Sequence, residues 1–354
     1  MRLAKISLRA FCCCVACLLV GTAAAGAETA RGPTEWRMAS AFPGSAVQLG
    51  TLGRRFAETV TALSGNVFAI RFVEPETGER PSALFDRVSR GQITAAWTTP
   101  AYWLEKDPAF ALFSSVPFGP DAPEYIAWMY YGGGAALRDE LYEPYGLVSL
   151  VCGAMAPEAG GWYRREIRSV KDFEGLKMRT FGLGAQVLEL FGVEPQPVPA
   201  DNLLSSLRNG SLDAVEFSMP AIDVGIGFAD TGPFHYYFPG WHQQTTLFEL
   251  LVGRPAWLSL TEAQRRQIRT ACGDNVMHGI AEGEAIQARA ILEIRRKGVG
   301  VKRFPPEVLS GLEKAWHEIA AIHSTKSKNF ERIWTSMTRF RKEYRVWRDL
   351  GYVR

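Results

Sequence analysis

The sequence predicts an α/β protein of two similar lobes, and three observations support that prediction. The chain has 354 residues, more than one ordinary hydrophobic core holds. Strand-like and helix-like segments alternate in β-α-β-α-β order over residues 36–98 and again over 176–217. In both units a glycine, Gly91 or Gly210, ends a helix, and a short apolar strand follows at the same offset. We therefore expect each lobe to be a sheet with flanking helices.

The N-terminus forms a separate segment. Three basic residues precede an apolar run over residues 11–20, and a small-x-small cleavage signal ends at Ala27. The run is too short to span a membrane, so the pattern predicts a secretory signal peptide cleaved after Ala27. Lipid attachment at Cys17 is the alternative. Residues 28–35 are expected to be a disordered leader.

Removal of residues 1–27 changes the charge and the cysteine count. The mature chain keeps 40 − 3 = 37 basic residues beside 37 acidic ones, so it is formally neutral and has no basic field for nucleic acid. Cys152 and Cys272 remain, in an oxidising compartment that permits a disulfide without requiring one. No further apolar run reaches about 18 residues, so we expect a soluble protein outside the cytoplasm.

Residues 36–98 provide the elements of the first lobe. Apolar residues recur at spacings of three and four before Ser64-Gly65, which predicts an amphipathic helix. Runs of β-branched and aromatic residues predict the strands. The expected strands span residues 36–42, 67–73 and 93–98, and the expected helices span residues 49–63 and 82–90.

An aromatic-rich segment over residues 102–134 separates the two units. Its triple glycine follows a helical stretch and lacks a phosphate-binding helix signature, so we expect a turn there. In the second unit Asp201 is the expected N-cap of a helix that ends at Arg208. A further helix is expected over residues 185–191, and the expected strands span residues 176–181, 193–198 and 212–217.

The C-terminal part is mainly helical. Thr261 caps a long helix that ends at Gly298. Aromatic residues line one face of the tail, so either its own domain or a partner chain must cover it. The other expected elements are a strand at 246–252 that returns to the first lobe, an extended segment at 299–304, and a helix at 309–322.

Short strand-like links near residues 151 and 249 predict a hinge between the lobes. The expected division gives lobe I residues 34–150 and 250–297, lobe II residues 151–249 and 298–325, and the C-terminal helix residues 326–354.

Glu216, Phe217 and Arg179 predict a ligand site. Glu216 and Phe217 follow the strand over 212–215 at its carboxyl end, the edge where open α/β sheets bind ligands. Arg179 lies near the end of the strand over 176–181, and its guanidinium suits a carboxylate. The alternatives are an ordinary edge glutamate and a surface arginine paired with a local acid.

Further oxygen donors predict a cation site. Glu158 precedes a Gly-Gly-Trp-Tyr turn, and Gln243 follows Pro-Gly-Trp-His. With Glu216 and the Phe217 carbonyl they suit a hard cation such as Na⁺ or Ca²⁺. Softer metals need histidines or thiolates, and the five histidines show no metal-ligand spacing, which leaves His242 as an unassigned neighbour. The aromatic residues expected to wall the pocket are Phe217, Trp162 and Tyr102.

The sequence contains no G-x-S-x-G, H-E-x-x-H or P-loop motif. Two alternatives to a small-molecule binding protein stay open. One is an enzyme acting on small acids, with Glu158 or His242 as general base. The other is a ligand-sensing module of a membrane signalling protein.

Seven motifs are distributed along the chain: Lys106-Asp-Pro-Ala-Phe-Ala-Leu-Phe113, Val116-Pro-Phe-Gly119, Tyr130-Tyr-Gly-Gly-Gly134, Gly160-Gly-Trp-Tyr163, Gly175-Leu-Lys-Met-Arg179, Asp213-Ala-Val-Glu-Phe217 and Phe238-Pro-Gly-Trp241. Together they resemble the extracytoplasmic solute receptors of TRAP transporters, the DctP family, and within it the branch that binds 2-oxo acids and lactate. The resemblance covers residues 34–350.

The resemblance implies a type II periplasmic-binding fold in which Arg179 holds the ligand carboxylate and a metal bridges ligand and protein through Glu216 and the Phe217 carbonyl. It also implies homodimers joined through the C-terminal helix. Two positions depart from the branch: Glu158 replaces the usual glutamine and Gln243 the usual glutamate, an exchange that keeps the total charge. We expect a periplasmic receptor, not an enzyme, that delivers a small 2-oxo or 2-hydroxy monocarboxylate to TRAP permease subunits.

Overall fold

The computed structural model describes residues 34–198 and 202–353. The predicted signal peptide, with its cleavage after Ala27, lies outside these residues, as does the predicted helix cap Asp201. Thr34 and Glu35, expected in a disordered leader, belong to the first strand because their backbone pairs with Phe68 and Ala69. Across the described residues, every helix is too short or too polar to cross a membrane.

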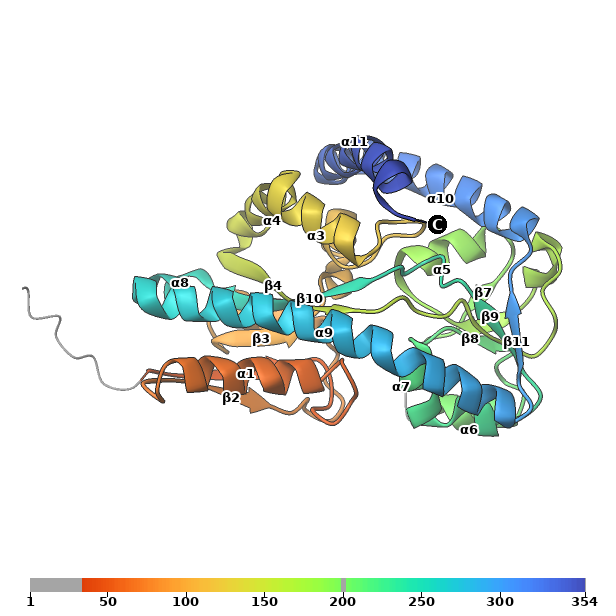
Figure 1. The fold of residues 1–354 in the computed structure, drawn as a ribbon, viewed down its shortest axis with the longest axis horizontal. Coiled ribbons are helices and arrows are strands. Elements are labelled where there is room, and N and C mark those ends of the chain that lie inside the picture. Colours follow the sequence, from red (N-terminus) through yellow and green to blue (C-terminus); the bar gives the residue numbers. More distant parts are fainter. Residues whose placement is uncertain (1–33, 199–201, 354) are drawn as a thin grey trace, which may run out of the picture. The chain divides into compact units, whose positions relative to one another are not determined.

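The first sheet contains five strands in the order β2-β1-β3-β10-β4 (Figure 1). β1, β2 and β3 are parallel, and β10 pairs antiparallel with β3 and with β4. The β-α-β-α-β order expected for residues 36–98 is therefore confirmed. The elements are β1 (Thr34–Ser40), α1 (Thr51–Leu63), β2 (Phe68–Val73), α2 (Ala83–Ser89), β3 (Ala95–Thr98), β4 (Leu147–Met155) and β10 (Thr246–Gly253).

The second sheet contains six short strands in the order β11-β9-β5-β8-β6-β7. Gly210 has a φ of 77°, the left-handed conformation expected where the preceding helix stops. The elements are β5 (Gly161–Tyr163), β6 (Lys177–Arg179), α5 (Gly182–Glu189), β7 (Glu194–Pro195), α6 (Leu203–Arg208), β8 (Ala214–Val215), α7 (Pro220–Ile226), β9 (His235–Phe238) and β11 (Gly300–Arg303).

The links expected near residues 151 and 249 lie inside the first sheet. Val151 pairs with Glu249 in the antiparallel ladder of β4 and β10, which extends to the pair Met155 and Thr246. These residues therefore belong with the first lobe, because hydrogen bonds hold them in its sheet. The segments that leave this sheet are 156–160 and 239–245.

The long helix α9 (Glu262–Arg296) is a third connection between the two lobes. Its N-terminus is capped by Thr261, as expected. It contacts α1 and β4 of the first lobe and α7 and β11 of the second (Figure 1). The Cys152–Cys272 disulfide, which the sequence left open, joins β4 to α9.

Two helices flank the triple glycine. α3 (Ala122–Tyr131) ends at Gly132, and α4 (Gly134–Tyr142) begins after Gly133, whose φ is 89°. The expected turn is confirmed, whereas α4 was not predicted. The remaining short elements are 3-10 helices at Pro100–Trp103, Pro108–Phe113, Glu143–Tyr145, Val170–Phe173 and Phe228–Asp230, and α8 (Arg254–Ser259).

The tail forms α11 (Lys328–Gly351), which follows α10 (Pro306–Lys326). α11 contacts α10, α3, α4 and the 3-10 helix at Pro108–Phe113 (Figure 1). Its residues Phe330, Ile333 and Met337 are fully buried. Other helices of the same chain therefore bury the apolar face of the first half of α11.

Candidate functional site

A cavity of about 490 Å³ is lined by both lobes. Its polar residues include Glu158, Arg179 and Gln243, which come from three separate segments. The apolar part of the lining includes Phe42, Leu49, Tyr102, Met155, Phe217, Ile222, Ile226 and Phe248. Polar groups therefore converge on a mainly apolar cavity, the usual composition of a small-molecule site.

Arg179 is the last residue of β6, beside Met178, whose side chain is fully buried. Its Nη1 donates a hydrogen bond to the Glu216 carbonyl oxygen at 2.7 Å. The guanidinium lies 5.0 Å from the Phe217 ring centroid and 5.2 Å from that of Phe181. Within the described ranges no acidic side chain forms an ion pair with it, so the remaining N–H groups can meet a carboxylate.

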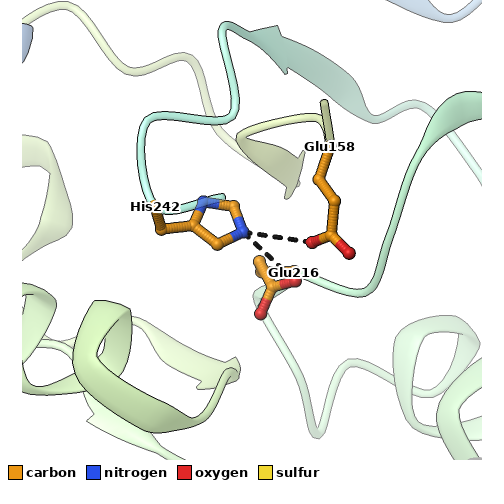
Figure 2. A group of neighbouring side chains, drawn as sticks. All are labelled: Glu158, Glu216 and His242. Carbon is orange, nitrogen blue, oxygen red and sulfur yellow. Dashed lines mark ion pairs between the residues drawn. The ribbon is translucent and has the colours of Figure 1, made fainter. Parts of the chain in front are cut away.

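Glu158, Glu216 and His242 form a buried cluster (Figure 2). His242 Nε2 lies 3.4 Å from Glu158 Oε2 and 3.4 Å from Glu216 Oε1. Glu216 directly follows β8, while Glu158 and His242 lie on the two segments that leave the first sheet. The Glu158 N–H donates to the Gln243 carbonyl oxygen at 3.1 Å, which holds those two segments together.

Gly240 permits the close approach of the two segments that carry Glu158 and His242. A Cβ at this position would lie 2.2 Å from the Glu158 carbonyl oxygen, so any other residue would push the two segments apart. The Pro-Gly-Trp turn thereby brings His242 close to Glu158.

The three side chains strongly influence one another's protonation. Burial raises the pKa of Glu158 to about 7, although the neighbouring His242 imidazole opposes this rise. Burial also raises the pKa of Glu216, but His242, Arg179 and Glu158 together outweigh this and leave the pKa below its ordinary value. Burial lowers the pKa of His242, but the neighbouring carboxylates of Glu216 and Glu158 together outweigh this and raise the pKa to about 9. The raised pKa of His242 and the lowered pKa of Glu216 both favour an ion pair between the imidazolium and that carboxylate.

The cluster fits a metal ion. Glu158 Oε2, Glu216 Oε1 and His242 Nε2 are buried and form no hydrogen bond within the described structure. One donor atom from each residue lies within 4.8 Å of the others. In the described structure these atoms are satisfied through the two ion pairs with His242, and a metal ion bound among them would take the place of those pairs.

His242 is the site residue that sequence reasoning did not assign. It is distant in sequence from both glutamates, and histidine spacing within the chain gave no signal. Its position directly before Gln243, already expected in the site, was the one available indication.

Gln243 lines the cavity, but its side chain is engaged. Its Oε1 accepts a hydrogen bond from Ser115 Oγ at 2.6 Å, and its side chain also bonds to Glu158, lowering the pKa of that glutamate. Its assignment as an ion ligand, like that of the Phe217 carbonyl, stays a prediction.

Two of the three expected wall residues line the cavity. Phe217 and Tyr102 do so, and burial raises the pKa of Tyr102 to about 12. Trp162 does not line it. Its side chain is buried inside the second lobe, where Nε1 donates to Asp223 Oδ2 at 2.8 Å and the ring stacks on Tyr236. An indole needs a partner for its N–H when buried, and Asp223 provides one.

Comparisons with known proteins agree with this architecture. Residues 38–326 match the DctP family, described as bacterial extracellular solute-binding protein, family 7. A monocarboxylate 2-oxoacid-binding periplasmic protein of Nostoc sp. PCC 7120 is 29% identical over 315 residues, which are 88% of this chain and 85% of the relative.

Two solved structures are similar over most of both chains. A TRAP transporter solute-binding protein from Bordetella bronchiseptica RB50 is 30% identical with a TM-score of 0.86, covering 91% of this chain and 96% of that one. It is a mixed-occupancy dimer with copurified calcium and picolinate in one active site and a second, apo site. A TRAP periplasmic solute-binding protein from Pseudoalteromonas atlantica, with bound sodium and pyruvate, is 30% identical with a TM-score of 0.80, covering 89% and 95%.

Proposed function

The chain belongs to the DctP family of bacterial extracellular solute-binding proteins, and from this premise we propose that it binds a small 2-oxo or 2-hydroxy monocarboxylate between its lobes and delivers it to TRAP permease subunits. The observation that carries this proposal is that Arg179 and Glu158 line the same cavity, and that Arg179 has no acidic ion-pair partner among the described residues. Glu216 and His242, which complete the buried cluster with Glu158, line a small pocket that shares Gln243 with this cavity.

In this proposal Arg179 orients the ligand carboxylate. Its guanidinium is held by the Glu216 carbonyl and by the Phe181 and Phe217 rings, so it loses little further freedom on binding. Charge-assisted hydrogen bonds of this kind are worth about 1.5–3 kcal/mol each.

Glu158 and Glu216 are the proposed ligands of a hard cation, Na⁺ or Ca²⁺, with the Phe217 carbonyl and Gln243 as further candidates. When bound, the cation would bridge the 2-oxo or 2-hydroxy oxygen and carboxylate of the ligand to the protein. The Bordetella and Pseudoalteromonas proteins, which hold calcium with picolinate and sodium with pyruvate, support this pairing.

The rest of the cavity favours a ligand whose substituent is apolar. Phe42, Ile222 and Phe248 give this part of the lining an apolar surface, and Arg179 is the one basic residue among the described residues that line the cavity. A second carboxylate would therefore lose its water there without gaining a cationic partner. A dicarboxylate should therefore bind more weakly than a monocarboxylate of similar length.

We also propose a periplasmic protein, exported by a signal peptide cleaved after Ala27, that releases its ligand chemically unchanged. The last turns of α11 expose Val346, Trp347 and Leu350, and this apolar end is the proposed contact with a second copy. The dimer of the Bordetella protein is consistent with this arrangement.

Titration calorimetry of the mature protein tests the proposal. Pyruvate, lactate and a dicarboxylate are titrated with and without prior chelation of metal. We expect the monocarboxylates to bind, with affinity reduced by the chelator. Binding by none of them would overturn the proposed ligand class, and binding insensitive to the chelator would overturn the role of the cation.

A further inference from the structure

We propose that the preferred ligand is a 2-oxo or 2-hydroxy monocarboxylate with an extended aliphatic side chain of about three to four carbons, and that Gly225 of α7 leaves the space for that side chain. The inference deepens the proposed function and rests on it, because it concerns the ligand of the same cavity. Pyruvate and lactate, whose side chain is a single methyl group, would be the weaker ligands.

The first support is the volume of the cavity. At about 490 Å³ it lies within the range of about 300–1,000 Å³ that is usual for sites of drug-sized ligands. Arg179 and Glu158 are the charged residues among the described residues that line it, and most of the remaining lining is apolar. A ligand with one methyl group would leave most of this apolar surface without contact. It would therefore forgo the hydrophobic and packing stabilisation that a longer side chain gains.

The first lobe forms one wall of the cavity with the segment 41–49, between β1 and α1. This segment is held at two points. The Gly44 N–H donates to Glu74 Oε2 at 2.8 Å. The fully buried Gln48 donates from Nε2 to the Gly279 carbonyl oxygen of α9 at 2.7 Å. The wall is therefore tied to the rest of the fold, and in particular to α9.

The second lobe forms another wall of the cavity with α7. The Ala221 N–H, in the first turn of α7, donates to Gln287 Oε1 at 3.0 Å, and Gln287 Nε2 donates to the Gly283 carbonyl oxygen at 2.7 Å. Gln287 and Gly283 belong to α9, and Gly283 lies about one helical turn from Gly279. Both walls are therefore anchored to neighbouring turns of one helix, which defines the space between them.

Gly225 leaves open space on the α7 wall. The residues of α7 that line the cavity are Ala221, Ile222, Gly225 and Ile226. Residues three and four positions apart share one face of a helix, so a side chain at position 225 would belong to the face that lines the cavity. A Cβ there would meet no heavy atom within 4 Å apart from its neighbours in the chain. Glycine is a poor helix former and the φ of Gly225 is not left-handed, so the backbone itself does not require a glycine.

A homologous series of ligands tests the inference on the wild-type protein. Pyruvate, 2-oxobutanoate, 2-oxopentanoate and 4-methyl-2-oxopentanoate share the carboxylate and the 2-oxo group and differ in the aliphatic side chain. Each buried CH₂ group is worth about four-fold in affinity. In calorimetry at fixed Na⁺ and Ca²⁺ concentrations we therefore expect 4-methyl-2-oxopentanoate to bind at least about 10-fold more tightly than pyruvate. Equal or weaker binding of 4-methyl-2-oxopentanoate would overturn the inference.

The matched variants are Gly225→Leu and Gly273→Leu. A leucine at position 225 should occupy part of the cavity, so it should weaken 4-methyl-2-oxopentanoate at least about 10-fold and pyruvate less than about three-fold. Gly273 is exposed on α9, and a Cβ there also meets no heavy atom within 4 Å, so its variant should bind both acids like the wild type. Equal losses for the two acids in Gly225→Leu, or no loss for the longer one, would contradict the role given to Gly225.

The ligand series on the wild type covers the case in which Gly225→Leu does not fold. It also separates the two proposals. Binding of none of the four acids would overturn the proposed ligand class, and the side-chain preference with it. Binding of all four without any gain from the longer side chains would overturn the side-chain preference alone and leave the proposed function standing.

Discussion

Arg179 and Glu216 are joined by two hydrogen bonds, one between their main chains and one from the Arg179 side chain to the Glu216 main chain. The Glu216 N–H donates to the Arg179 carbonyl oxygen at 2.9 Å, and Arg179 Nη1 donates to the Glu216 carbonyl oxygen at 2.7 Å. The first bond belongs to the pairing of β6 with β8, in which Arg179 lies opposite Val215. Sheet register therefore sets the guanidinium that we propose for the ligand carboxylate beside the residue that we propose for the cation.

Replacement of Arg179 by alanine should weaken binding of pyruvate or lactate by about 10- to 150-fold. The variant removes at least one charge-assisted bond, worth about 1.5–3 kcal/mol. Arg179→Lys should recover part of the affinity, because it restores the charge without the planar fork. Calorimetry measures both, with Arg90→Ala, an exposed arginine on the first lobe, as the control. An unchanged affinity in Arg179→Ala would exclude this arginine from the site.

Acidic residues at the end of α11 should convert a dimer to a monomer. Trp347 is 59% exposed and Leu350 83%, so aspartates there remove little packing within the chain, chiefly the edge contact of Trp347 with Tyr352, while placing charge on the proposed contact. Light scattering after gel filtration should give half the wild-type mass, with an unchanged melting temperature.

Met337→Asp is the contrasting variant, because Met337 is fully buried within its own chain. It should lower the melting temperature through an unpaired buried charge. A wild-type protein that is already monomeric, or aspartate variants that stay dimeric, would contradict the role given to this end of the helix.

Removal of the disulfide should reduce stability and leave binding intact. Cys152 and Cys272 are separated by 120 residues, and a cross-link over so long a loop strongly restricts the unfolded chain. The double alanine variant should lose about 2–5 kcal/mol of unfolding free energy in urea. Wild-type protein treated with a reductant should behave likewise. Equal stability of all three forms would show that the bond contributes nothing.

Glu249 should make stability fall as the pH rises. It is buried in β10, where it accepts hydrogen bonds from Trp103 and Ser149. Burial raises its pKa and these bonds only partly oppose this, so the folded state binds the proton more tightly than the unfolded chain does. Its contribution is complete below the ordinary glutamate pKa and is lost as the pH rises through the higher folded-state pKa.

Urea unfolding at about pH 5 and about pH 8 measures this effect in the wild type and in Glu249→Gln, which stays neutral. The wild type should lose stability relative to the variant across that interval, by about 1.4 kcal/mol for each unit of pKa elevation. Glu318→Gln, on the exposed face of α10, is the control. Parallel pH profiles for wild type and Glu249→Gln would contradict the prediction.

Local signals in the sequence determined the elements and their order. The spacing of apolar residues predicted α1, the capping residue Thr261 predicted the start of α9, and Gly210 predicted the stop before β8. These features act within a few residues along the chain, so no tertiary contact is needed to recognise them. The same holds for Arg179 and Glu216, because each follows from its position at the end of a strand.

Only the tertiary structure decided which distant side chains meet. The pairing of β4 with β10 places residues 151 and 249 in the first lobe. The close approach of Gly240 to the Glu158 main chain puts His242 beside the carboxylates. The hydrogen bond to Asp223 holds the Trp162 side chain in the core of the second lobe. The Cys152–Cys272 bond and the burial of Phe330 also depend on which surfaces pack together. Such pairings are set by packing over long sequence separations, which the periodicity of one segment does not encode.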